Sequence, residues 1–340
     1  MGGRLMRDNR QTQTIMLIVF AVVGLALPLV ARARFAQHIL IMIALYAVLG
    51  EAWNIMAGYA GMVSIGQAAF FGLGAYVSSF LFVEYSVNPW IGFIASGLVT
   101  AAFGTLVGLP FSRLRGRYFA IGTIALGQMI KVVFENWQRV GAATGLMLPL
   151  VGEGVANFQF HTTKLPYYYI AFAMLLAVIA FMRAMERSRM GYYFKAIREN
   201  EDVASGLGVN KTAYKLVAIA VSAGITGMCG TFLAQYSLYV EPEYMFNHTI
   251  SVTIALIPVF GGAGSIAGPI LGSAILIPIS ELTRAWLGSG GTGIDLMLYG
   301  AFIVLMCVYE PEGLMGMVRR AREKAIARRE RRGSTQCPNL

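Results

Sequence analysis

The stretch YKLVAIAVSAGITGMCGTFLAQYSL, from Tyr214 to Leu238, decides the fold class of this chain. As an α-helix it is long enough to cross the roughly 30 Å hydrocarbon core of a bilayer. Comparable apolar runs recur along the 340 residues, of which 57% are hydrophobic and 13% charged, at a mean hydropathy of +0.63. Soluble chains are about 45–50% apolar, and a transmembrane barrel would show short alternating strands. The sequence therefore predicts an all-α, polytopic integral membrane bundle.

About eight to ten transmembrane segments are predicted, several of them broken or re-entrant. No low-complexity linker divides the chain, so residues 1–340 are predicted to form a single transmembrane domain with its membrane bundle at 14–310. The ten candidate segments are 15–31, 39–57, 64–83, 90–110, 118–134, 166–182, 214–238, 250–260, 266–285 and 294–309.

The distribution of Lys and Arg predicts the orientation, because short basic loops stay on the cytoplasmic side. Loop 111–117, the charged segment 183–213 and the basic tail 316–340 are expected in the cytosol. The nearly neutral segment 135–165 and the acidic segment 239–249 suit the outer face. Ten crossings then place both termini in the cytosol, and one basic pair disagrees with this topology: Arg32 and Arg34.

The net charge of +10 is concentrated at the two ends of the chain. The tail carries eight basic residues against Glu323 and Glu330. No aromatic interleaving or nucleic-acid motif accompanies this charge, so the sequence favours anchoring on an anionic lipid surface and no nucleic-acid partner.

Motifs for catalysis or nucleotide binding are missing from the sequence. There is no G-x-x-x-x-G-K-[ST] phosphate loop, no H-E-x-x-H and no G-x-S-x-G. The three histidines are isolated along the chain, and the three cysteines match no metal-site spacing. We therefore expect a non-catalytic chain without a cofactor or metal of its own, so that any ATP and Mg²⁺ would be bound by another polypeptide.

Segment 183–213 is a charged island between apolar runs, with six basic and four acidic residues. A first short helix is predicted at 192–198. Asn200 can cap a second helix, with Glu201 and Asp202 in its first turn, where they suit the positive end of the helix dipole. Gly208 is the expected terminator. Three residues are expected to share one packing face by their i, i+3, i+4 spacing: Val203, Ala204 and Leu207. An interfacial helix lying on the bilayer is the alternative to a helix that docks in a partner's groove.

Residues 199–208 resemble the cytoplasmic EAA loop of ABC importer permeases, with Asp202, Val203, Ala204 and Gly208 at its key positions. Longer stretches are similar to the permease family of branched-chain amino acid importers, and the similarity covers about residues 40–310. It looks closest to the M-type subunit of that family. The stretches that carry the resemblance are 58–76, 114–123, 191–210, 214–216 and 260–269.

This resemblance implies a heterodimer with a second, homologous H-type permease, two cytosolic ABC ATPases and a periplasmic substrate-binding protein, in a bacterial inner membrane. The substrate would be a branched-chain or related amino acid, with amides and urea left open, since Gln67 stands where the family usually has His. The residues implied to couple to the ATPases are Arg198, Glu199, Glu201, Asp202, Val203, Ala204 and Gly208.

Two polar, glycine-rich interruptions are candidates for a translocation pathway. Irregular backbone at membrane depth is tolerated where protein or water surrounds it, and a buried carboxylate costs roughly 2.5–3.5 kcal/mol on insertion scales. The candidate pathway residues are Glu51, Asn54, Ser64, Gln67, Gly261, Gly262 and Ser265. Packing glycines and a protonated or paired structural carboxylate are the alternatives. The order Gly58-Tyr59-Ala60-Gly61 faintly echoes 261–264, which indicates either an internal repeat or chance.

An ion-coupled secondary transporter with broken helices is the rival hypothesis. It would need mid-membrane carboxylates to bind the ion, and Glu51 is the persuasive candidate in the sequence.

Overall fold

A computed structural model describes residues 21–28, 33–114, 116–160 and 162–287, together with 297, 300–301, 313–316 and 320. The predicted segment 294–309 and the basic tail 316–340 lie almost entirely outside these residues. So does most of the predicted segment 15–31, of which residues 21–28 are helical.

Within the described residues the chain is helical, with one very small sheet, as predicted. Seven helices there are long and apolar enough to span a membrane. The main helices are α2 (Arg34–Asn54), α3 (Gln67–Tyr85), α4 (Pro89–Phe111), α5 (Arg117–Asn136), α6 (Leu165–Arg187), α7 (Arg189–Glu199), α8 (Glu201–Gly206), α9 (Lys211–Ser237), α10 (Pro242–Met245), α11 (His248–Gly261) and α12 (Ala267–Leu287). The predicted segments from 39–57 to 266–285 all fall on these helices.

Local capping explains where several helices begin. The side chain of Asn88 accepts from the backbone N–H of Trp90, and Pro89 occupies the first position of α4. Asn210 caps α9 and Asn247 caps α11 in the same way. Asparagine side chains thus satisfy N–H groups at helix starts that would otherwise have no intrahelical partner.

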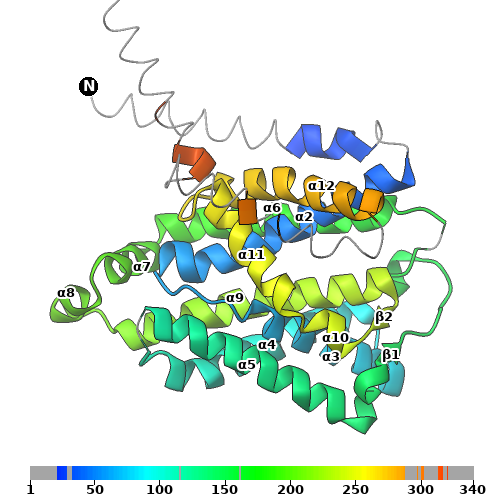
Figure 1. Ribbon diagram of the computed structural model, residues 1–340, viewed down its shortest axis with the longest axis horizontal. Helices are drawn as coiled ribbons and strands as arrows, with labels where there is room; N and C mark the ends of the chain where they lie inside the picture. The colour runs from blue at the N-terminus through cyan, green and yellow to red at the C-terminus, as the bar shows by residue number, and fades with distance from the viewer. Residues whose placement is uncertain are drawn as a thin grey trace, which may run out of the picture.

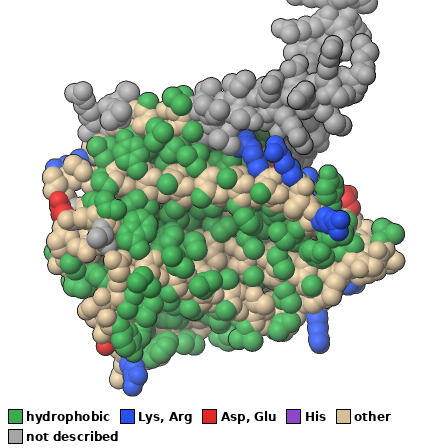
Figure 2. Space-filling model, turned by 180° about the vertical axis from the view of Figure 1, so that it is seen from behind, with side chains coloured by type: hydrophobic (Ala, Val, Ile, Leu, Met, Phe, Trp, Pro, Cys, Tyr) green, Lys and Arg blue, Asp and Glu red, His purple; other side chains and the backbone are tan. Residues whose placement is uncertain are grey.

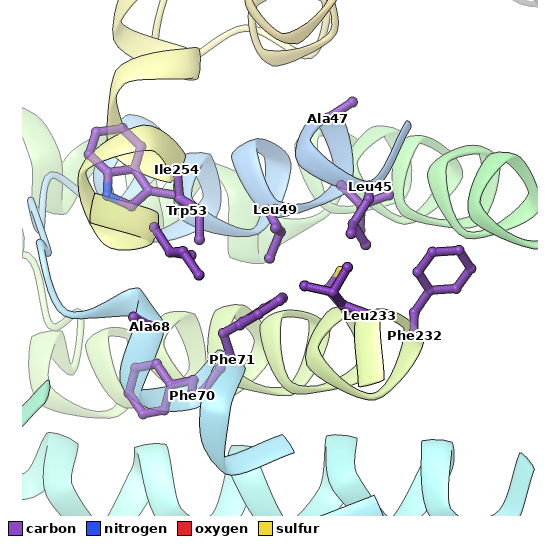
Figure 3. Close-up of a cluster of buried hydrophobic side chains, with 14 of the residues drawn as sticks. Leu45, Ala47, Leu49, Trp53, Ala68, Phe70, Phe71, Phe232, Leu233 and Ile254 are labelled. Atoms are coloured by element: carbon purple, nitrogen blue, oxygen red, sulfur yellow. The ribbon is translucent and has the colours of Figure 1, made fainter. Parts of the chain in front are cut away.

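Helix α9 is the centre of the bundle and packs most extensively against α3 and α4, with α2 on its other side (Figure 1). Close approach depends on small residues, since a Cβ on Gly230 would overlap the backbone of Phe71 in α3. Leu45 and Leu49 of α2 face Phe71 and Leu233 across this core (Figure 3). All four side chains are buried.

Two segments of the membrane bundle are interrupted. The last turn of α2 widens into a π-helix, η1 (Ile55–Tyr59), and an irregular stretch follows to Gly66 before α3 begins. The helix α11 has 14 residues and rises only about 21 Å at 1.5 Å per residue, after which residues 262–266 lead into α12. Helices therefore end at both predicted glycine-rich stretches, with irregular backbone at 60–66 and 262–266, and a break at membrane depth stays a prediction.

The two ends of the bundle differ in construction. At one end α7 and α8 project beyond the other helices, and at the opposite end lie α10 and the two short strands (Figure 1). Strand β1 (Leu146–Met147) pairs antiparallel with β2 (Tyr239–Val240). The two segments predicted to share the outer face, 135–165 and 239–249, therefore meet.

The flank formed by α4 and α5 is strongly apolar. The back of the molecule, seen in Figure 2, is also rich in hydrophobic side chains, and its basic side chains lie toward its margins. Exposed apolar side chains on these two helices include Ile91, Leu98, Leu106, Ile121 and Val132. Such a surface is expected where a bundle faces lipid.

Candidate functional site

The charged segment 183–213 folds into the end of α6, the helix pair α7 and α8, and the start of α9. Helix α7 spans Arg189–Glu199 and is therefore longer than the predicted helix at 192–198. The side chain of Asn200 caps α8 as predicted, accepting from the N–H of Asp202 at 3.0 Å and of Val203 at 3.1 Å. Gly208 follows α8 with φ +85°, and its backbone N–H donates to the carbonyl of Ser205.

The apolar residues of α8 do not share one face, which corrects the sequence prediction. Val203 and Leu207 are 60% and 80% exposed, whereas Ala204 is 2% exposed. Ala204 therefore packs against the protein itself, and Val203 and Leu207, four residues apart, form an outward apolar face. Glu199 is exposed at the end of α7.

Two ion pairs fix α8 to the start of α9. The ammonium of Lys215, which is 3% exposed, lies 2.5 Å from the carboxylate of Glu201, and Lys211 lies 3.2 Å from Asp202. Lys215 is buried and Glu201 is partly exposed, so loss of Glu201 would leave a buried ammonium without this carboxylate, which is destabilising. Glu201 and Asp202 were predicted to couple α8 to a partner, and they also bind α8 to α9 of the same chain.

The first helix break comprises η1 and residues 60–66. Gly61 has φ +75°, a conformation that residues with a Cβ rarely adopt. The indole N–H of Trp53 donates to the carbonyl of Ser64 at 2.7 Å, and the hydroxyl of Ser64 accepts from the N–H of Gly66 at 3.2 Å. These bonds satisfy backbone groups that the break removes from the helical ladder.

The second helix break comprises residues 262–266. Gly264 has φ +81°, and the hydroxyl of Ser265 donates to the carbonyl of Gly262 at 2.8 Å. The same hydroxyl accepts from the N–H of Gly268 at 3.1 Å, in the first turn of α12. Gly261 and Gly262 are buried.

Asn54 joins the two breaks. Its side-chain amide donates to the carbonyl of Ser265 at 3.0 Å, and its carbonyl oxygen accepts from the N–H of Gly264 at 2.7 Å. The breaks approach so closely that a Cβ on Gly58 would overlap the Asn54 oxygen and lie 2.6 Å from the nitrogen of Gly264. Asn54 is fully buried, so this pair of hydrogen bonds fixes the position of the second break relative to the first.

The candidate pathway residues on α2 and α3 are buried inside this chain. Glu51 is 0% exposed, with one carboxylate oxygen 3.4 Å from the Asn54 amide and the other without a hydrogen-bond partner among the described residues. The amide of Gln67 donates to Ser222 at 3.1 Å, and Gln67 accepts from Thr226 at 3.3 Å. Gln67 thus binds α3 to α9, and lining of a pathway stays a prediction for these residues.

Contacts between α6, α7 and the first break were not foreseen from the sequence. The hydroxyl of Tyr59 donates to Glu186 at 2.6 Å, and the ammonium of Lys195 lies 5.8 Å from the centre of the Tyr59 ring. The guanidinium of Arg198 donates to the carbonyl of Gly58. The residues that make these contacts are far apart in sequence, and periodicity carries no signal for them.

A second polar cluster lies at the other end of α2, around His38. One ring nitrogen of His38 is 2.7 Å from the hydroxyl of Tyr236, and the other is 3.6 Å from Glu281. Glu281 also lies 3.5 Å from Arg284. This cluster connects α2, α9 and α12 at the end of the bundle remote from α8.

The described residues form a polytopic helical bundle with two irregular glycine-rich stretches and a projecting helix pair, an arrangement compatible with a membrane transport protein. The chain belongs to the family described as branched-chain amino acid transport system / permease component, which matches residues 35–307.

Several curated proteins are similar to the chain over most of its length. The high-affinity branched-chain amino acid transport system permease protein LivM of Salmonella typhimurium is 30% identical over 90% of this chain and 76% of its own length. The protein of the same name in Escherichia coli is 29% identical over the same shares. The permease protein LivH of Salmonella typhimurium is 24% identical over 80% of this chain and 91% of its own length. No solved structure matches the chain.

Proposed function

We propose that the chain is the transmembrane permease subunit of an ABC importer for branched-chain or related amino acids, amides and urea being the neighbouring possibilities. A second, homologous permease would complete the membrane unit, two cytosolic ATPases would hydrolyse ATP, and a periplasmic protein would deliver the substrate. Membership of the permease family supports this, as do the names of its relatives, which include both the M-type and the H-type permease proteins.

The observation that carries the proposal is the outward face of α8. Val203 and Leu207 are highly exposed on a helix whose first turn is capped and whose base is held by a buried ion pair. Apolar side chains on a rigid projection are suited to insertion into a groove of another protein. The carboxylates of Glu201 and Asp202 pair with lysines of α9, and the exposed surface of α8 combines the apolar side chains of Val203 and Leu207 with the polar Asp202 and Ser205.

The proposed orientation follows from charge and from the ends of the bundle. The positive-inside rule assigns the α7–α8 end to the cytosol. Loop 111–117 belongs to the same end, because Gly108 near the end of α4 lies against Leu216 at the start of α9. The end with β1, β2 and α10 would then face the periplasm and the binding protein.

The proposed mechanism uses the two breaks as the moving part. ATP binding in the ATPases displaces α8, and the buried residues around the breaks rearrange to open the pathway between the two permeases. In this account Glu51, Asn54, Ser64, Gln67, Gly261, Gly262 and Ser265 set the position of the breaks in the state described here and become accessible in another.

Substitution of Leu207 tests the proposal. In Leu207→Asp a charge replaces an exposed apolar group, so folding should be unaffected. Burying that charge in a partner groove is costly, and we expect at least tenfold less ATPase to co-purify and a matching loss of ATP-dependent uptake. Ser205→Asp, also exposed but on another face of α8, is the matched control and should retain both.

Two results would contradict the proposal. Normal co-purification of the ATPase with Leu207→Asp would remove the docking role of α8. Uptake into vesicles by the purified permease alone, driven by an ion gradient, would favour the ion-coupled transporter instead.

A further inference from the structure

Arg198 reaches both helix breaks from the last turn of α7. Its guanidinium nitrogen Nη1 donates to the carbonyl of Gly58 at 2.5 Å. Its backbone and aliphatic stem lie against Gly61, with Cα 3.2 Å from the position a Cβ would take there. The same Nη1 is 2.6 Å from the Cβ position of Gly264. Arg198, in the charged segment 183–213, therefore contacts the first break through its guanidinium and its stem, and its guanidinium also lies beside the second break at Gly264.

The carbonyl of Gly58 is available to Arg198 because the backbone ladder is altered there. In a regular α-helix the N–H of Met62 would bond to the carbonyl of Gly58, four residues earlier. In this chain the N–H of Met62 bonds to the carbonyl of Met56 at 2.9 Å, and that of Ala60 bonds to Ile55, five residues earlier. The π-helix thus leaves the Gly58 carbonyl to an outside donor, and Arg198 supplies a charge-assisted one.

The contacts of Arg198 form a continuous route between α8 and the second break. Asn200, two residues after Arg198, caps α8. From the Gly58 region the route continues through Asn54, whose side chain bonds to Gly264 and Ser265. A displacement of the α7–α8 pair therefore acts on the first break through Arg198 and on the second through Arg198 and Asn54.

We propose that Arg198 is a positioning residue that transmits the movement of α7 and α8 to both helix breaks, rather than a contact for the ATPase itself. The inference rests on the proposed function, since it assumes that a partner moves α8. Loss of this charge-assisted hydrogen bond would let α8 move without carrying the breaks with it. The importer would then hydrolyse ATP without moving substrate.

The decisive experiment uses the assembled importer in proteoliposomes and measures ATP hydrolysis and substrate uptake on the same sample. Arg198→Met keeps the length of the stem and removes the donor. We expect the ATPases to co-purify and to hydrolyse ATP within about twofold of wild type, while the uptake per ATP falls at least tenfold. Arg198→Lys, which retains a charged donor but not the planar fork, should restore part of the uptake.

Arg189→Met is the matched control, because Arg189 is exposed at the other end of the same helix. Arg189→Met should change neither ATP hydrolysis nor the uptake per ATP. Unchanged uptake per ATP in Arg198→Met would overturn the proposal. Loss of ATPase co-purification in that variant would also overturn it, since Arg198 would then be a docking contact.

A second measurement needs no ATPase and separates this inference from the proposed function. Ala263, exposed in the second break, is replaced by cysteine in a chain whose Cys307 and Cys337 are changed to serine, and its labelling rate by a water-soluble maleimide is measured. We expect Arg198→Met to raise that rate several-fold and Arg189→Met to leave it unchanged. Equal labelling rates of Ala263→Cys in the chain with Arg198 unchanged, in Arg198→Met and in Arg189→Met would refute the link between Arg198 and the second break. Absence of ATP-dependent uptake in the wild-type assembly would refute the proposed function alone.

Discussion

The two helix breaks share a sequence order and a turn, yet the protein holds them differently. Gly58-Tyr59-Ala60-Gly61 and Gly261-Gly262-Ala263-Gly264 both end on a glycine with positive φ, +75° and +81°. In each break a serine follows, and its hydroxyl accepts a backbone N–H as the next helix begins. The common geometry is what an internal repeat predicts. It also suits any turn that needs a glycine with positive φ, so the repeat stays a prediction.

The difference lies in the partners of each break. The first contains a π-helix and receives Trp53 from α2, Glu186 from α6 and Arg198 from α7. The second is bonded chiefly through Asn54, a residue at the start of the first. The first break thus bonds directly to α6 and α7, whereas the second bonds to Asn54 and lies beside the guanidinium of Arg198. We infer that the first break receives the movement and the second follows it.

The largest expected effect comes from Gly58, where the two breaks touch. In Gly58→Ala the new Cβ would overlap the Asn54 oxygen and press on the backbone of Gly264. Overpacking of this kind costs about 1–3 kcal/mol, and it separates the breaks. We expect a fall of several degrees in the midpoint of thermal unfolding in detergent and at least a tenfold loss of uptake.

Gly127→Ala on α5 is the control for Gly58→Ala. A Cβ on Gly127 meets nothing within 4 Å, and alanine is favoured over glycine inside a helix by roughly 0.5–1 kcal/mol. The control should therefore be as stable as wild type or slightly more stable, with normal uptake. If Gly58→Ala behaved in the same way, the close contact of the breaks would be wrong.

A smaller effect is expected from Asn54→Leu, which leaves the first break intact and releases the second. The N–H of Gly264 then loses its acceptor, at a cost of about 1–3 kcal/mol for a buried donor. The labelling rate of Ala263→Cys should increase in Asn54→Leu. This variant adds no Cβ at Gly58, so the increase would come from the lost hydrogen bonds and not from overpacking. Asn136→Leu is a suitable control, because the exposed Asn136 amide bonds within its own helix. Labelling unchanged by Asn54→Leu would mean that the second break is held by other contacts.

The sequence revealed which elements form the breaks, but not how they are joined. Apolar run length located α2 to α6, α9, α11 and α12, and glycine with serine marked both interruptions, because these signals act over a few neighbouring residues. Asn200 and Gly208 at the ends of α8 were predictable for the same reason. The partners of Asn54 and Arg198 were not, since each bond spans more than a hundred residues. The inward turn of Ala204 also depended on packing that periodicity does not show.

The smallest expected effects compare the matched serines, Ser64 and Ser265. The Ser64 hydroxyl accepts from the N–H of Gly66 just before α3, and that of Ser265 accepts from the N–H of Gly268 in the first turn of α12. A hydrogen bond of this kind contributes about 0.5–1.5 kcal/mol. The hydroxyl of Ser265 additionally donates to the carbonyl of Gly262, whereas the carbonyl of Ser64 is held by Trp53 independently of its hydroxyl. We therefore expect Ser265→Ala to lower the unfolding midpoint more than Ser64→Ala and to increase labelling of Ala263→Cys, while Ser64→Ala leaves that labelling unchanged. Equal effects in both assays would show that the two breaks are held alike, and the order of movement inferred here would lose its basis.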